Sequence, residues 1–130
     1  MVLLGIDFGL KKIGLALAQS GLIQVLGVIR NSPQVIAKIG EICRENEVEK
    51  IIIGLPPAQL SSKIKKFAQK LSSETSLPVE FQDETLTSRE AIVKMIKEGI
   101  KRKKRGLLKD AAAAACILQE YLLRKEETGV

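Results

Sequence analysis

The chain has 130 residues, of which 45% are hydrophobic and 28% are charged. This balance fits one folded domain over residues 1–130 and excludes a disordered, collagen-like or low-complexity chain. The formal net charge is +6, and the absence of histidine excludes Ser-His and Cys-His catalysis and His-ligated zinc.

The positive charge is concentrated in one basic run, which consists of Lys101, Arg102, Lys103, Lys104 and Arg105. Without these five charges the formal net charge falls to +1. A nearly neutral body with one basic segment indicates a polyanionic partner, although such a run is also typical of a solvated loop. The scarcity of aromatic residues, three Phe and one Tyr, argues against a surface that stacks on unpaired bases.

The first third of the chain predicts three strands joined by short turns. Residues 2–8, 13–18 and 23–30 are mainly apolar, and glycines occur in the segments between them. Such short connections favour an antiparallel meander.

The remaining chain alternates predicted helices and strands. A helix that Pro33 opens has an apolar face formed by Val35, Ile36, Ile39, Ile42 and Cys43. Residues 50–54 are a continuous apolar run typical of a strand buried on both faces. A helix over 60–71, a strand over 78–82, a helix over 92–100 and an Ala-rich helix over 107–124 follow. Right-handed crossovers place the later strands parallel to the first, which predicts an α/β fold with a mixed five-stranded sheet and helices on both faces.

Other features predict a cytoplasmic protein without membrane association. No apolar run approaches the ~20 residues of a membrane helix. The first seven residues have the pattern of a core strand and lack the basic start of a signal peptide. Cys43 and Cys116 lie in apolar helical patterns, which predicts reduced, buried thiols.

Acidic residues occur at the ends of predicted elements. Asp7 ends the first strand, Asp83 and Glu84 follow the last strand, and Asp110 lies in the first turn of the Ala-rich helix. The predicted topology brings these ends to one edge of the sheet, where carboxylates would repel each other unless a hard cation such as Mg²⁺ bound them. Each residue also has a structural explanation, as a turn former or as a favourable charge at a helix start.

Four motifs resemble one family along nearly the whole chain. Residues 5–16 read GIDFGLKKIGLA and resemble the G-I-D-x-G-x-K-R-I-G-x-A opening of the YqgF-type, Holliday-junction-resolvase-like proteins, which are described as pre-16S rRNA nucleases. Gly54-Leu55-Pro56 resembles that family's G-L-P, and residues 83–88, DETLTS, resemble its D-E-R-L-T-T. Residues 110–122 resemble its D-x-x-A-A-x-x-I-L-x-x-Y-L ending. Because all four occur in the family's order, the chain is identified as a member.

The resemblance implies a ribonuclease-H-like fold and a nuclease that hydrolyses phosphodiester bonds with Mg²⁺ or Mn²⁺. It assigns catalysis and metal binding to Asp7, Glu84 and Asp110, and a nucleic-acid-binding role to Lys11 and Lys12. Asp83 is the rival of Glu84 for the metal-facing position. The basic run would add phosphate affinity that does not depend on sequence.

The function implied is processing of the 5′ end of pre-16S rRNA in ribosome biogenesis, with structured RNA as the partner. Two alternatives stay open: a Holliday junction resolvase acting on branched DNA, which favours a twofold dimer, and a non-catalytic nucleic-acid-binding module. The sequence leaves open whether the protein is a monomer or a homodimer. Three departures from the family pattern bear on substrate binding: Thr85 replaces an Arg, Gln19-Ser20-Gly21 replaces a Ser-Asp pair, and the loop after Gly-Leu-Pro is short.

Overall fold

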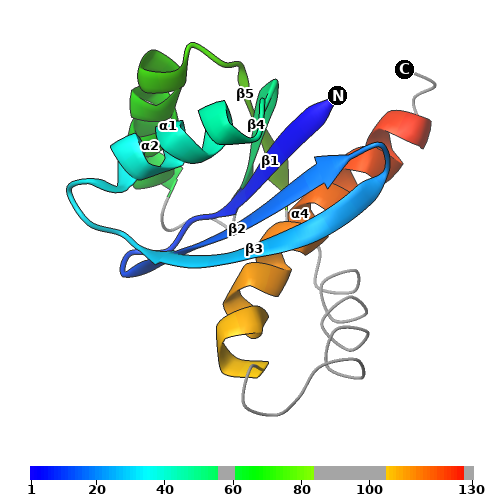
Figure 1. Cartoon of the computed structure of the whole chain (residues 1–130), viewed down its shortest axis with the longest axis horizontal. Helices are drawn as coiled ribbons and strands as arrows, with labels where there is room; N and C mark the ends of the chain where they lie inside the picture. The colour runs from blue at the N-terminus through cyan, green and yellow to red at the C-terminus, as the bar shows by residue number, and fades with distance from the viewer. Residues whose placement is uncertain (56–60, 84–104, 128–130) are drawn as a thin grey trace.

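The computed structural model describes residues 1–55, 61–83 and 105–127, without the side chains at 61, 83, 105–111 and 125–127. A five-stranded sheet forms its centre, with strand order β3-β2-β1-β4-β5 (Figure 1). The strands are β1 (Val2–Asp7), β2 (Lys12–Gln19), β3 (Leu22–Arg30), β4 (Lys50–Leu55) and β5 (Val79–Asp83). The helices are α1 (Val35–Glu45), α2 (Ser61–Thr75) and α4 (Arg105–Glu127).

The sheet is mixed, as the sequence predicts. β1, β2 and β3 are successive antiparallel neighbours, and Asp7 at the end of β1 pairs with Gly14 of β2. β4 runs parallel to β1 and β5 runs parallel to β4. The carboxyl ends of β1, β4 and β5 therefore lie on the same edge of the sheet.

Helices cover both faces of the sheet (Figure 1). Helices α1 and α2 bury their apolar stripes, including Ile39 and Phe67, on one face. Helix α4 packs on the other face with Ala114, Leu118 and Tyr121. Within β1, even-numbered residues such as Leu4 belong to the α1/α2 core, whereas Leu3 belongs to the α4 core. Burial on both faces explains why β1 and β4 are continuously apolar.

Gly5 lets α4 approach the sheet closely. A Cβ atom at this position would lie 2.5 Å from Leu118 Cγ and 2.9 Å from the backbone oxygen of Ala114. The alanines at 112–115 are all buried, so small side chains line the same contact on the helix. Together, Gly5 and this alanine run set the distance between α4 and β1.

The predicted elements agree with those described to within a few residues at their ends. Helix α4 begins two residues before the predicted start and ends three residues after the predicted end, a difference typical of fraying helix termini. The helix predicted over 92–100 lies outside the described residues. Cys43 and Cys116 are buried and neither is joined in a disulfide, as predicted for both. In the part of the chain that the structure describes, every helix is too short or too polar to span a bilayer.

Candidate active site

Asp7 lies at the sheet edge where three parallel strands end. The last residues of these strands are Asp7 in β1, Leu55 in β4 and Asp83 in β5, and Leu55 and Asp83 pair directly. Neighbouring strands lie ~4.8 Å apart, so the backbones at Asp7 and Asp83 are roughly 10 Å apart across β4. A ligand at this edge is thus within reach of side chains from the ends of both strands when they lie on the same face of the sheet.

The alternation of β1 assigns Asp7 to the face that α4 covers. Leu3 packs in the α4 core and Gly5 touches α4 directly, and Asp7 continues this odd-numbered series. The Asp7 side chain is only partly buried, so it is accessible to a ligand. Asp7 therefore lies at the boundary between the α4 interface and solvent.

Helix α4 runs antiparallel to β1. Near the start of β1, Leu3 pairs with Lys50, whose ammonium group donates a hydrogen bond to the Tyr121 hydroxyl. Farther along β1, Gly5 faces Ala114 and Leu118. The helix backbone therefore advances toward the Asp7 end of β1 as residue numbers fall, and position 110 is one turn beyond Ala114 in that direction.

The loop that follows Asp7 is held by side-chain and backbone contacts. Asn31 donates from its side-chain amide to the Gly9 carbonyl and from its backbone N–H to the Lys11 carbonyl, each at 2.8 Å. A Cβ at Gly9 would collide with the backbone oxygen of Lys12, which explains a glycine there. These contacts restrict the segment that carries Asp7 and the two lysines.

Phe8, the residue after Asp7, anchors the same loop to α2. Its ring contacts the ring of Phe67 with a centroid distance of 4.9 Å and an interplanar angle of 56°. Aromatic pairs at this separation add ~0.5–1.5 kcal/mol beyond the area that they bury. The contact places the middle of α2 beside the segment that carries Asp7.

Basic side chains border this corner of the sheet. Lys11 and Lys12 are exposed, and Lys12 pairs across the sheet with Arg30, which is also exposed. Sequence reasoning missed Arg30 and Asn31, because their roles depend on the register of β3 against β2. These three cations and Asp7 together could bind a phosphate ester: the basic side chains, and a metal ion held by Asp7, would offset its negative charge.

Among the described residues, no three acidic, histidine or cysteine side chains form a group that could hold a metal ion. Glu84 and the basic residues Lys101 to Lys104 lie outside the described residues; Arg105 and Asp110 lie in α4, but their side chains are not described. The predicted metal ligands are all carboxylates, and hard oxygen ligands fit Mg²⁺ and Mn²⁺.

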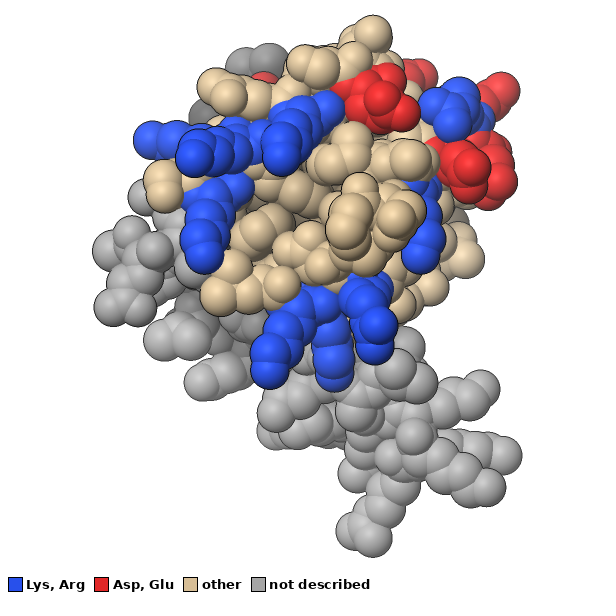
Figure 2. All heavy atoms as spheres, turned by 90° about the vertical axis from the view of Figure 1, so that its left-hand side faces the viewer, with Lys and Arg blue, Asp and Glu red and all other residues tan. Residues whose placement is uncertain are grey.

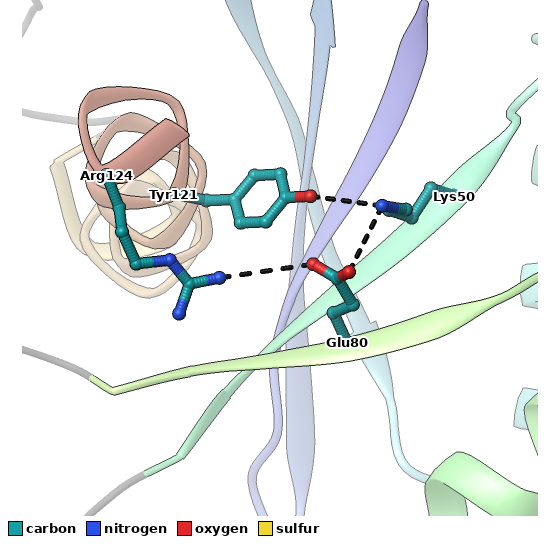
Figure 3. A network of polar contacts seen from close by, with 4 residues as sticks. All are labelled: Lys50, Glu80, Tyr121 and Arg124. Carbon is teal, nitrogen blue, oxygen red and sulfur yellow. Dashed lines mark hydrogen bonds and ion pairs between the residues drawn. The ribbon is translucent and has the colours of Figure 1, made fainter. Parts of the chain in front are cut away.

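A polar network anchors the other end of α4 (Figure 3). Lys50 donates hydrogen bonds to Tyr121 Oη at 3.1 Å and to Glu80 Oε1 at 3.2 Å. The hydrogen bond to Tyr121, followed by that to Glu80, raises the pKa of Lys50 against the opposing effect of burial. Arg124 lies 3.9 Å from Glu80 Oε2 and 5.3 Å from the centre of the Tyr121 ring. The network ties α4 to β4 and β5 and so fixes the position of the helix along the sheet.

The comparisons with known proteins agree with this architecture. Residues 1–124 match the family model described as "RuvX: Holliday junction resolvase". A protein of Agathobacter rectalis named "Putative pre-16S rRNA nuclease" is 38% identical, with 94% of each chain covered. A protein of the same name from Dictyoglomus thermophilum is 33% identical, with 94% of this chain and 95% of the relative covered.

Solved structures of two resolvases share the fold. RuvC of T. thermophilus in complex with a Holliday junction substrate has a TM-score of 0.63 and 22% identity, with 99% of this chain and 97% of that chain covered. The fowlpox virus Holliday junction resolvase has a TM-score of 0.62 and 14% identity, with 95% of this chain and 99% of that chain covered. At these identities the likeness establishes a common fold, which confirms the predicted ribonuclease-H-like class.

Proposed function

Since this chain belongs to the RuvX family of Holliday junction resolvases, we propose that it is a divalent-metal-dependent nuclease formed by a single domain over residues 1–130. The observation that carries the proposal is the position of Asp7. It lies on the α4 side of an open sheet edge, and α4 advances toward that edge through position 110.

Three carboxylates, from Asp7, Glu84 and Asp110, would hold Mg²⁺ or Mn²⁺ in this proposal. Their donor chemistry fits these ions. Asp7 ends β1, Glu84 follows β5 in the sequence, and Asp110 lies in α4; β1 and β5 end at the same edge of the sheet, and the α4 backbone advances toward that edge. When bound, the cation supplies Lewis-acid activation of the phosphate and offsets the charge that develops on it.

The chain's own residues would bind and orient the substrate. Lys11 and Lys12 bind backbone phosphates beside the scissile bond, and the braced loop keeps them in place. The backbone of Asp7 is fixed by its pairing with Gly14 of β2, and the preceding residue, Ile6, is also paired with β4. The run from Lys101 to Arg105 adds phosphate contacts whose strength falls with salt.

We propose pre-16S rRNA as the substrate, because the relatives that are more than 30% identical carry that name. A four-way DNA junction is the second candidate, because the family model and both structural relatives are named for junction resolution. RNA processing needs one active site per cut, whereas symmetric junction resolution favours a twofold dimer.

A cleavage assay on both substrates tests the proposal. Purified protein is incubated with pre-16S rRNA and with a four-way junction, with Mg²⁺, with Mn²⁺ and with a chelator. We expect metal-dependent cleavage of the RNA that Asp7→Asn abolishes. The melting temperature of this variant without metal should equal or exceed that of the wild type, because one acidic charge is removed from the group. Cleavage of the junction alone would favour the second candidate, and wild-type cleavage by Asp7→Asn would refute the site.

A further inference from the structure

The outer surface of α2 carries basic charge that the proposed active site does not use. Four lysines, Lys63, Lys65, Lys66 and Lys70, lie within eight residues of this helix, and all four are exposed. Its buried stripe is formed by Ile64, Phe67, Ala68 and Leu71, which face the sheet. The lysines therefore lie on the parts of the helix that are open to solvent.

Three of these lysines form a row, which we call the α2 lysine row: Lys63, Lys66 and Lys70. Their spacing of three and four residues puts them on one side of the helix, and seven residues of helix span about 10 Å. Consecutive phosphates of one strand advance ~3.4 Å along a duplex, so the row matches roughly three phosphates. Within the described part of the chain, none of the three lysines forms an ion pair.

The α2 lysine row begins at the same sheet edge as Asp7. Helix α2 follows the carboxyl end of β4, which is parallel to β1, so its first turn lies on the Asp7 side of the molecule. Phe67 of the buried stripe follows Lys66 in the sequence and contacts Phe8, the residue after Asp7. Because a helix with its side chains is ~10–12 Å across, the exposed side of α2 lies about one helix diameter from the sheet, on the face opposite α4.

The neighbouring helix does not share this charge. Helix α1 exposes Lys38 and Arg44 together with Glu41 and Glu45, so its charges of opposite sign balance. Figure 2 shows the side of the molecule that carries α1 and α2: Lys and Arg gather on its left and lower parts, and Asp and Glu gather at its upper right.

An open hollow beside the α2 lysine row is lined by Lys66, Gln69, Lys70, Ser73 and Glu74. Its Gln and Ser side chains can form hydrogen bonds with a sugar-phosphate backbone. The acidic Glu74 marks the end of the basic surface.

We propose that the α2 lysine row is a second nucleic-acid contact, which binds the phosphate backbone of the substrate on one side of the cleavage site. The inference rests on the proposed function only in taking nucleic acid as the ligand. The proposal predicts that the substrate extends from Asp7 across α2. A long helical RNA should therefore bind more tightly than a short RNA that contains only the cleavage site.

The test measures binding without cleavage. A fluorescein-labelled RNA hairpin with a long stem is titrated with protein in EDTA over a range of salt concentrations, and anisotropy reports the affinity. The double variant Lys66→Gln/Lys70→Gln is compared with Lys38→Gln/Arg44→Gln, which loses the same net charge from α1. Each phosphate contact contributes ~0.7–0.9 to the slope of log affinity against log salt.

We expect the α2 double variant to reduce this slope by about 1.4–1.8 and the α1 double variant to leave it unchanged. Thermal melts confirm that both remain folded. If the α2 variant binds like the wild type, or if both variants lose affinity equally, the inference is wrong while the nuclease proposal stands. If the wild type binds neither RNA nor a DNA junction, the proposed function itself fails.

Discussion

Replacing Gly5 with Ala tests whether the approach of α4 to β1 controls the active site. The new Cβ would lie 2.9 Å from the backbone oxygen of Ala114, about 0.5 Å inside ordinary contact distance, and 2.5 Å from Leu118 Cγ. The Leu118 side chain can rotate, but the Ala114 oxygen moves only with the helix. Overpacking of this kind costs ~1–3 kcal/mol. For a chain of this length the melting temperature should fall by roughly 3–5 °C per kcal/mol.

Activity should fall more than stability does. Position 110 is one turn from Ala114, so a shift of the helix at Ala114 also shifts the backbone that carries Asp110. A misplacement of about 1 Å at a catalytic group can reduce the rate about 100-fold. We therefore expect Gly5→Ala to remain folded at 25 °C and to cleave about 10- to 100-fold more slowly.

A matched control is Gly40→Ala in α1. There the added Cβ meets only flexible side chains, Glu74 and Arg44, at 3.4 Å or more. Alanine is favoured over glycine in a helix by up to about 1 kcal/mol, so this variant should melt at a higher temperature and cleave normally. If Gly5→Ala has the stability and the rate of the wild type, the close contact does not position α4.

Three further perturbations test other parts of the structure. Burial raises the pKa of the Cys43 thiol from 9.0 to about 11, so the unfolded chain loses this proton first. The contribution of Cys43 to stability should therefore be constant below pH 9 and fall as the pH rises from 9 toward 11. The loss should be about 2–3 kcal/mol in urea unfolding, and Cys43→Ala should remove most of it. Tyr121→Phe removes an acceptor from Lys50 and should cost ~1 kcal/mol in the same assay, since Lys50 keeps its contact with Glu80. Changing residues 101–105 to glutamine should lower the salt dependence of RNA binding without lowering the melting temperature; an unchanged slope would mean that the run is only a solvated loop.

The arrangement of the sheet could be predicted because local patterns determine it. Strands joined by short turns must be antiparallel neighbours, and an apolar run between helices indicates a strand buried on both faces. Asp7 was predicted at the edge for the same reason, since a polar residue that ends an apolar strand lies where the core ends. Its assignment to the α4 side required the register of Leu3 and Gly5, which the structure supplied.

Contacts between distant residues were not predictable from these patterns. Lys50 and Tyr121 are 71 positions apart, and the only signal of their contact is a lysine at the start of a buried strand and a tyrosine in a buried helical stripe. The contact of Asn31 with Gly9 similarly depends on β3 lying beside β2. The lysines of α2 can be read from the sequence, but the position of this helix next to the loop that follows Asp7 is shown only by the contact between Phe8 and Phe67. The roles of Glu84 and Asp110 stay predictions.

The alternation of β5 bears on which acid faces the metal. Phe81 packs in the α1/α2 core, whereas Glu80 forms an ion pair with Arg124 of α4, so odd and even positions face opposite sides of the sheet. Asp7 falls on the α4 side, and the same alternation favours Glu84 over Asp83 as its partner. We therefore predict that Glu84→Gln reduces cleavage by about 10²–10³-fold and weakens Mn²⁺ binding, measured by calorimetry, because a charged group at the reacting phosphate is lost. Asp83→Asn removes the same charge one residue earlier and should keep metal affinity close to that of the wild type. The reverse result would mean that the chain departs from strand alternation at residue 83, with the same edge of the sheet still forming the site.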